Sequence, residues 1–394
     1  MASTINSSTS NGIVITPDTS GEIELQANGV TKAKITANGL QDANGASLRG
    51  GSFRNLIING DMRIDQRNAG ASVSLPSSTV VFPSDRFYFY YQMGASSVTT
   101  QRVSDAPTDF EYSSKITVGT GDTATASEVA LFRQLIEGNN VAHLKCGTAD
   151  AKTVTLSFWV KSSVTGSYGI GIRNSASNRN YVMTYTISSA NTWEKKTLTF
   201  TNDTTGTWLK DNGIGLTITW DLGSGSNWHT ATTETWDTAG KFTTSSQANL
   251  IGTSGATWQI TGVQLEVGSG ASDFEFLPYD VQLARCQRYY YQLNSTTTPF
   301  TITGITAGGN NIFTYWHPVP MRSAPSTTFS GSFQVYSFSS AGATQTGPSN
   351  ITSITANTNL YGGRFYTAKY GQSGLITWSD WAGTTAVFEN SAEL

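Results

Sequence analysis

Aromatic side chains set among polar, turn-forming residues are the strongest chemical signal in this sequence. They occur in a central segment, residues 221–237, and again near residue 380. The candidate ligand-binding residues are Trp228, His229, Trp236, Asp237, Trp378, Asp380 and Trp381. A tryptophan or tyrosine ring offers a broad apolar face without net charge, and such faces stack on the C–H faces of sugars. The pattern therefore predicts glycan binding at these segments.

Packing in a core is the competing interpretation for every tryptophan. Trp220 and Trp258 lie in segments that alternate polar and apolar residues, so we expect both rings in a core. Trp228 is the best ligand candidate because its neighbours form turns and not strands. For His229 and His317, hydrogen bonding within the protein or to water is a better explanation than ligand binding.

Residue patterns of known enzymes are absent from the sequence. There is no phosphate-binding loop, serine-nucleophile motif, zinc-protease motif or pair of cysteines at metal spacing. Residues 169–171 and 213–215 resemble pieces of a nucleotide motif, but they fall inside strand patterns. A glycan hydrolase would need two carboxylates roughly 5–9 Å apart, and no pair of acids stands out. We expect a protein that is not an enzyme, with no catalytic residue, metal or cofactor.

The low charge of the chain narrows the range of partners. The 24 Lys and Arg residues nearly balance the 27 Asp and Glu residues, and the net charge is -3. Nucleic-acid binding needs a basic surface that neutralises phosphates, so we expect no nucleic acid partner. No apolar run approaches the ~20 residues of a membrane-spanning helix, so we expect no membrane insertion. Two cysteines are too few for a disulfide framework.

Short runs of β-branched and aromatic residues, separated by Gly, Asn, Asp and Ser, must position the candidate side chains. Residues 53–278 hold the clearest strand patterns, at 87–91, 154–160, 213–220 and 258–267. Residues 129–136 are compatible with helix or strand, and their surroundings favour a strand. About nine strands in this region predict an all-β fold with a two-sheet jelly-roll sandwich.

Residues 1–52 have a different texture. Asn-Gly pairs occur at 11–12, 28–29, 38–39 and 44–45, and no aromatic residue precedes Phe53. Because Asn-Gly favours tight hairpins, one or two hairpins are predicted within residues 21–40. So few large apolar side chains cannot form a core alone. We expect an anchor or trimerisation arm that packs on copies of itself, with a floppy arm as the alternative.

The most helix-like segment of the chain runs from Pro278 to Tyr291. Leu283, Cys286 and Tyr290 would share one face of this helix and form an apolar stripe. We therefore expect a connecting helix within residues 279–296. Residues 297–394 return to the strand-and-turn pattern with almost no charge, which predicts a distal β domain suited to neutral glycans.

Several segments together resemble bacteriophage tail-fibre and other virion appendage proteins, which carry a carbohydrate-binding-module-like jelly-roll domain. The resemblance rests on the order and spacing of these segments between about residues 53 and 325. The segments are 55–68, 84–87, 155–162, 263–268, 274–279, 286–290 and 318–322. The last four residues, Ser391 to Leu394, are also similar to the ends of such fibres.

The resemblance implies a virion structural protein, a tail-fibre subunit that attaches to glycan on the host surface. It implies a homotrimer that assembles in the host cytoplasm and joins other virion proteins through residues 1–52. In that reducing compartment, Cys146 and Cys286 are expected to remain free thiols. A capsid decoration or head-fibre protein is the alternative, and a glycan depolymerase is less favoured. The resemblance supplies no sugar-binding or catalytic residue for this chain.

Overall fold

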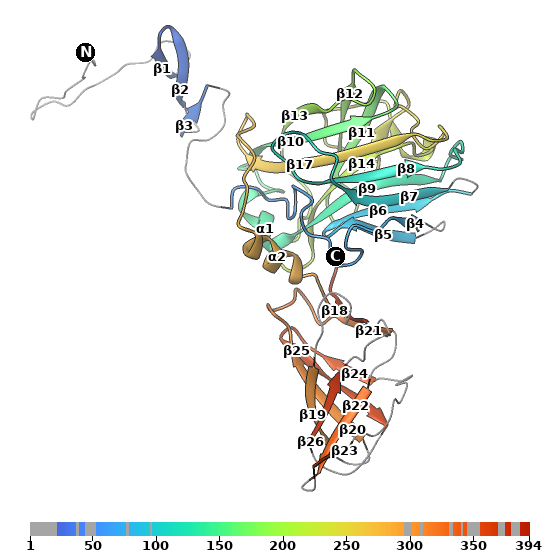
Figure 1. Ribbon diagram of the computed structural model, residues 1–394. Coiled ribbons are helices and arrows are strands. Elements are labelled where there is room, and N and C mark those ends of the chain that lie inside the picture. The colour runs from blue at the N-terminus through green and yellow to red at the C-terminus, as the bar shows by residue number, and fades with distance from the viewer. Residues whose placement is uncertain are drawn as a thin grey trace, which may run out of the picture.

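The strands of the chain form three parts. The computed structural model describes residues 22–36, 39–43, 53–75, 79–94, 97–294, 301–307, 310–330, 334–339, 342–344, 355–368, 375–379 and 387–394. A small N-terminal sheet precedes a central sandwich of two sheets, and further sheets follow on the C-terminal side (Figure 1). The predicted all-β fold, with a stem, a jelly-roll sandwich, a short helix and a C-terminal β domain, is confirmed.

The N-terminal sheet is built from hairpins, as the Asn-Gly pairs predict. Its strands are β1 (Ile23–Ala27), β2 (Val30–Thr36) and β3 (Gly39–Asp42). Asn28 and Gly29 join the first two strands with φ angles of 53° and 73°, as a tight hairpin turn requires. Four of its large apolar side chains are between 42% and 55% exposed, namely Leu25, Val30, Ile35 and Leu40. Residues 1–21 and 44–52 of the predicted arm lie outside the described residues.

The central sandwich contains two six-stranded antiparallel sheets. The first contains, in spatial order, β13 (Glu194–Thr201), β10 (Thr153–Ser162), β17 (Thr257–Val267), β8 (Ser113–Val118), β7 (Val98–Val103) and β4 (Val73–Leu75). The second contains β12 (Asn180–Ile187), β11 (Gly166–Arg173), β14 (Ile214–Asp221), β9 (Val129–Glu137), β6 (Phe87–Gln92) and β5 (Thr79–Ser84). The chain crosses between the sheets at each step from β8 to β11, as in a jelly roll.

Alternating side chains fill the space between the two sheets. In β9, Ala130, Phe132 and Ile136 point inward and are at most 2% exposed, so the ambiguous run at 129–136 is a strand, as predicted. Trp220 and Trp258 are fully buried and approach Phe132 edge to face, with ring centroids 6.0 and 5.2 Å away. The predicted core position of both tryptophans is confirmed.

Short elements connect the strands of the sandwich. The helical turns are α1 (Gly138–Val141), η1 (Ala142–Leu144) and η2 (Ser226–Trp228). A parallel pair, β15 (His229–Thr230) and β16 (Thr243–Thr244), lies within the long connection from β14 to β17. Among the described residues, no helix has both the length and the apolar character needed to cross a membrane.

The connecting helix is shorter than the sequence predicts. Helix α2 (Tyr279–Gln287) ends early, and Tyr290 instead begins strand β18 (Tyr290–Asn294). Tyr290 pairs with Ser391, at one end of an antiparallel ladder. Aromatic residues favour strands over helices, so the available partner strand decides the outcome. Cys286 and Tyr290 of the predicted apolar stripe are both buried, but they lie on different elements.

Two sheets form the distal part. A three-stranded sheet contains β18, β27 (Val387–Ser391) and β21 (Ser326–Ser330). A seven-stranded sheet contains β23 (Gly342–Thr344), β22 (Gln334–Ser339), β26 (Leu375–Ser379), β19 (Thr301–Ala307), β20 (Asn310–Trp316), β25 (Gly362–Ala368) and β24 (Thr355–Thr358). The smaller sheet lies between the sandwich and the larger sheet (Figure 1). It combines strands from both sides of the predicted boundary at residue 297.

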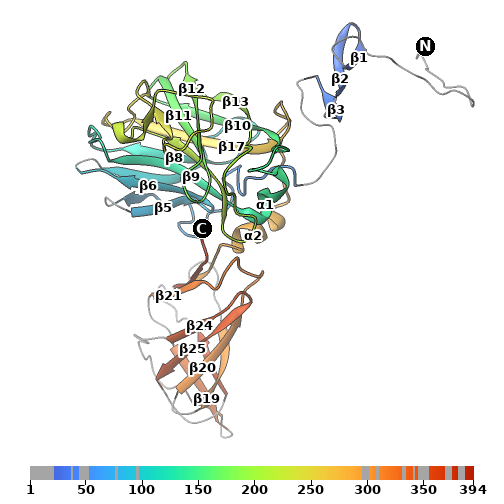
Figure 2. The same cartoon turned by 180° about the vertical axis from the view of Figure 1, so that it is seen from behind.

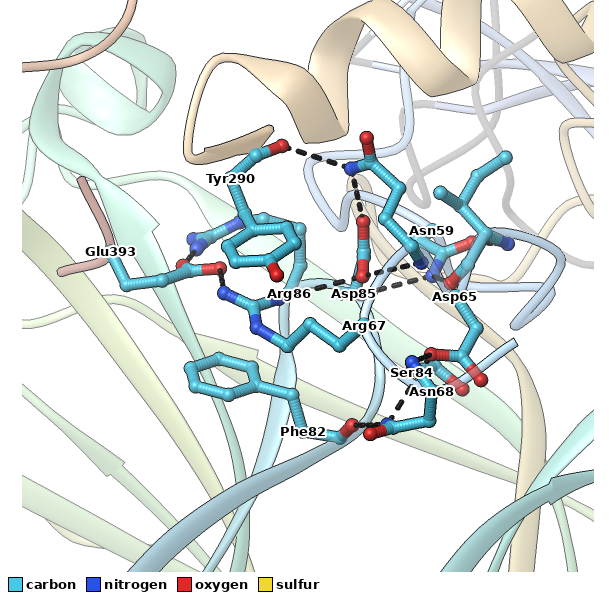
Figure 3. Close-up of polar contacts among 12 residues, drawn as sticks. Asn59, Asp65, Arg67, Asn68, Phe82, Ser84, Asp85, Arg86, Tyr290 and Glu393 are labelled. Carbon is cyan, nitrogen blue, oxygen red and sulfur yellow. Dashed lines mark hydrogen bonds and ion pairs between the residues drawn. The ribbon is translucent and has the colours of Figure 1, made fainter. Parts of the chain in front are cut away.

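Buried charges tie the last residues of the distal part to the sandwich (Figure 3). The carboxylate of Glu393 forms ion pairs with Arg86 and with Arg67, the latter at 3.1 Å. Arg86 is 3% exposed, and its guanidinium lies 3.6 Å from the ring centroid of Tyr289. The short segment after β27 is therefore a buried contact and not a loose tail.

Arg67 and Asp85 extend this contact. The guanidinium of Arg67 lies 3.6 Å from the ring centroid of Tyr290 and pairs with Asp85 at 3.4 Å. Asp85 also accepts hydrogen bonds from the backbone and side chain of Gln66, at 3.1 and 2.5 Å. Burial raises the pKa of Asp85 to about 6, although Arg67 opposes the shift. We call Arg67, Asp85, Arg86, Tyr290 and Glu393 the clamp.

Replacing Glu393 tests the clamp. In Glu393→Ala, Arg86 would stay buried without a carboxylate, so we expect the free energy of unfolding to fall by about 3–5 kcal/mol. Asp150→Ala is the matched control, because its ion pair with Lys145 leaves the two side chains 73% and 51% exposed. We expect the control to lose less than about 1 kcal/mol. Urea unfolding followed by tryptophan fluorescence measures both, and equal losses would contradict the clamp.

Candidate functional site

Strand β6 supplies aromatic side chains to both faces of the second sheet. Phe87, Phe89 and Tyr91 point into the sandwich and are fully buried. Tyr88 and Tyr90 point the other way and are partly exposed. Because side chains alternate along a strand, the aromatic run at 87–91 builds the core with one half and an outer surface with the other.

The outer side of the second sheet carries a groove of about 230 Å³, lined by residues of strands β5, β6 and β9. Strands β5, β6 and β9 are neighbours in this sheet (Figure 2). We call this groove the aromatic groove, and its lining residues are Val80, Phe82, Tyr88, Tyr90, Arg133 and Leu394. The rings of Phe82 and Tyr88 lie 5.8 Å apart at an angle of 52°. Arg133 donates a hydrogen bond from Nε to Oγ1 of Thr219 at 3.1 Å. Such a surface can stack on an apolar ligand face and donate hydrogen bonds to oxygen atoms at its edge.

The connection from β14 to β17 covers the neighbouring part of the same sheet. Phe242 of this connection lies against Gly171, where an added Cβ would come within 2.3 Å of the Cβ of Phe242. At Gly169, an added Cβ would come equally close to Oγ1 of Thr243. The two glycines therefore allow the connection to lie directly on strand β11.

Trp228 stacks on Phe242 beside the aromatic groove. Their ring centroids are 5.1 Å apart at 21°, and the indole N–H of Trp228 donates to the backbone oxygen of Ser127 at 3.1 Å. Trp228 and Tyr90 both pack against the buried cluster of Val129, Leu131 and Phe242. The predicted ligand residue Trp228 is thus partly exposed and continues the aromatic surface beyond the groove.

His229 is held by hydrogen bonds within the protein, as the sequence predicts. Its Nε2 lies 3.0 Å from the backbone oxygen of Ser224 and 3.2 Å from Nε2 of Gln247. Asp221 in turn fixes Ser224, because its carboxylate accepts hydrogen bonds from the Ser224 backbone N–H and hydroxyl. Burial raises the pKa of Asp221 to about 6. These residues hold the turn that carries Trp228.

Trp236 and Asp237 belong to a different cluster from Trp228. Trp236 packs at the edge of the sandwich core, perpendicular to Trp208, with the ring centroids 5.5 Å apart. Its indole N–H donates to the backbone oxygen of Thr201 at 2.8 Å. Asp237 accepts a backbone hydrogen bond from two residues further on, at 2.8 Å. The two tryptophans of the central segment therefore pack in separate places, and ligand binding by Trp236 and Asp237 stays a prediction.

The distal candidate residues are placed only in part. Trp378 lies in strand β26, between β22 and β19. Asp380 and Trp381 lie outside the described residues. Ligand binding by all three stays a prediction. In the same part of the chain, His317 is hydrogen bonded as expected, with its Nδ1 3.2 Å from the backbone oxygen of Leu360.

Sequence reasoning missed Tyr88, Tyr90 and Arg133 as candidate site residues. One signal was available, because five successive aromatic residues in a strand cannot all face one core. The place of Arg133 depends on the pairing of β6 with β9, which sets Arg133 opposite Tyr88. No local pattern specifies that register.

The other cavity and the other clusters of polar side chains give weaker grounds for a binding or catalytic site than the aromatic groove. A larger cavity, of about 680 Å³, lies beside Arg54 and Glu266, which pair with each other at 3.7 Å. Within the described ranges, no group of three His, Cys, Asp or Glu side chains could hold a metal ion. Cys146 and Cys286 are buried free thiols, as expected, and burial raises the pKa of both, so neither is poised as a nucleophile.

Comparison with known proteins gives similarity to solved structures only. No protein-family model and no curated protein matches the chain. The enzymatically active domain of tailspike protein 4 from bacteriophage CBA120 is 16% identical over 54% of this chain and 21% of that chain, with a TM-score of 0.28. A putative sugar binding protein from Bacteroides thetaiotaomicron is 11% identical over 54% of this chain and 99% of that one, with a TM-score of 0.31.

A family 11 carbohydrate-binding module from Clostridium thermocellum, solved with a mixed-linked tetrasaccharide, is also similar. It is 14% identical over 52% of this chain and 99% of the module, with a TM-score of 0.26. TM-scores as low as these assign neither a fold family nor a function to this chain.

Asp221→Asn tests whether the buried carboxyl group holds a proton in the folded protein. Its pKa is raised from 3.8 to about 6, so the stability it contributes is complete below about pH 4 and is lost as the pH rises through 6. Relative to Asp221→Asn, we expect the unmutated chain to lose about 2–3 kcal/mol of unfolding free energy between about pH 4 and pH 7. Urea unfolding at both pH values measures this, and a difference that does not change with pH would refute it.

Proposed function

We propose that this chain is a virion structural protein, a tail-fibre subunit whose central sandwich attaches to glycan on the host surface. The observation that carries the proposal is the aromatic groove. There, Tyr88 and Tyr90 lie on the outer face of strand β6, whose other face is buried in the core. The place in the virion is inferred from the fibre-like segments of the sequence. Two of these segments, at 55–68 and 84–87, supply Arg67, Asp85 and Arg86 of the clamp.

The groove suits a sugar because its aromatic faces are fixed in direction. Residues two apart on a strand lie about 6.6 Å apart on the same face, so Tyr88 and Tyr90 present neighbouring rings. Arg133, another lining residue, provides N–H donors, and the Tyr90 hydroxyl donates to Gln92 at 3.0 Å. A site of rigid rings with few polar groups binds a flat, hydroxyl-rich ligand with little loss of side-chain freedom.

The N-terminal sheet supports a trimer. Its apolar side chains, Leu25, Val30, Ile35 and Leu40, remain exposed in the single chain. A closed assembly of three chains would bury them and cover the free strand edges. Three copies would also strengthen weak sugar binding through effective concentration.

Light scattering of a chain without residues 1–52 checks the trimerising role of these residues, because such a chain should be monomeric.

Alanine substitutions in the groove test the glycan proposal. We expect Tyr88→Ala and Tyr90→Ala each to weaken binding about tenfold, because each removes a stacking face. Tyr279→Ala is the control, since Tyr279 is 57% exposed and is not among the groove residues. A glycan array selects the ligand, and calorimetric titration measures its affinity for each variant. Unchanged affinity in both groove variants would remove the groove from the proposal.

Immunogold microscopy of intact virions tests the place of the protein. With an antibody against residues 297–394, we expect label at the tail tip or baseplate. A fibre subunit that attaches to the host through its sandwich must lie at that end of the virion, so its distal part is labelled there too. Label spread over the head would instead identify a capsid decoration protein.

A further inference from the structure

Two arginines at the aromatic groove and beside it have no carboxylate partner among the residues that the structure describes. Arg133 of β9 lines the groove, and Arg173 ends β11 on the same outer face of the sheet. Both guanidinium groups lie near one ring, that of Phe242, at 5.8 and 5.4 Å from its centroid. They are close enough for the charge of Arg133 to lower the pKa of Arg173.

Arg173 is the more unusual of the two. It is 9% exposed, and its Nε has no hydrogen-bond partner. Burial, together with the charge of Arg133, lowers the pKa of Arg173 to about 10. Among the residues that the structure describes, no carboxylate pairs with Arg133 or Arg173. A buried cation beside a second cation is costly without an anion.

Carboxylates on the same side of the molecule have other partners. Glu393 adjoins the groove residue Leu394, but Arg67 and Arg86 already bind it. Asp221 lies on the outer face of β14, two residues after Thr219, and accepts hydrogen bonds from Gly223 and Ser224. Two other arginines of the sandwich and the helix junction pair with carboxylates, Arg179 with Asp203 and Arg288 with Glu137. Within the described residues, no ion pair neutralises the positive charge beside the groove, and an anion from outside could do so.

We propose that the aromatic groove binds an acidic sugar, with its anionic group against Arg133, within the field of Arg173, and its ring on Tyr88 and Tyr90. This inference rests on the proposed glycan-binding function and gives its ligand class. The shared chemistry is a set of anionic oxygens, which a planar guanidinium can bind through two N–H donors. A uronic acid carboxylate and a sugar sulfate both provide it. The nearly uncharged distal domain would remain suited to neutral glycans.

Paired ligands that differ only in charge test the inference. Calorimetry with the full chain compares oligogalacturonate with its methyl ester, and dextran sulfate with dextran. We expect at least one acidic member to bind about tenfold or more tightly than its neutral partner at low salt, the expected gain from a charge-assisted hydrogen bond. The advantage should shrink as salt is added, because ions screen it. The two pairs distinguish a carboxylate from a sulfate.

Variants then assign the effect to the two arginines. Arg133→Gln should remove most of the preference for the acidic ligand, and Arg173→Gln should reduce it several-fold, since its charge acts from a distance. The thermal midpoint of ligand-free Arg173→Gln should be equal or higher, because the variant loses an unpaired buried charge. Arg364→Gln, at an exposed arginine of the distal part, is the matched control and should change nothing.

The outcomes separate this inference from the proposed function. If acidic and neutral partners bind equally, and Tyr88→Ala weakens both, the groove binds glycan and the acidic preference is wrong. If the acidic preference persists in Arg133→Gln and Arg173→Gln, the anion binds elsewhere and the inference is also wrong. If no glycan on the array or in these pairs binds the unmutated chain, the proposed function fails together with the inference.

Discussion

The alternation of side chains along β6 is the constraint on which both the core and the groove depend. A slip of one residue would send Tyr88 and Tyr90 into the core and Phe87 and Phe89 into water. The full burial of both phenylalanines prevents that slip, so the energy that stabilises the sandwich also fixes the outward tyrosines. A groove built this way is in place before any ligand arrives, and less conformational freedom is lost on binding.

Charge is scarce in this chain, and much of it is placed at contacts between segments. Arg86 and Glu393 join the sandwich to the last residues, and Arg288 holds Glu137 at 2.6 Å across the helix junction. Desolvated pairs of this kind specify one arrangement, because any shift leaves a charge without its partner. Residues 55–68 and 84–87 supply Arg67, Asp85 and Arg86 to this junction, so these segments fix how the parts are joined.

The parts of the structure that were predictable are those that depend on near neighbours in sequence. The hairpin at Asn28, the strand at 129–136 and the buried Trp220 follow from local turn chemistry and alternation. The groove does not follow from local sequence, because only the register between β6 and β9 places Arg133 opposite Tyr88. The early end of α2 also depends on a distant pairing. Tyr290 leaves the helix pattern and begins β18, whose partner strand β27 lies about 100 residues further along the chain. Local sequence cannot specify pairings of that range.

An unpaired charge is more informative about the ligand of this groove than an exposed ring. Exposed aromatic residues occur on many surfaces, and Tyr279 and Trp316 are exposed without lining the groove. Arg173 is different, because it is 9% exposed and no carboxylate of the described residues pairs with it. An anion beside it would lower the cost of burying its charge. Stacking alone distinguishes poorly between sugars, whereas a fixed charge rejects ligands that cannot neutralise it. The tyrosines of the groove would then supply affinity for a sugar ring, and the arginines would select which sugar is kept.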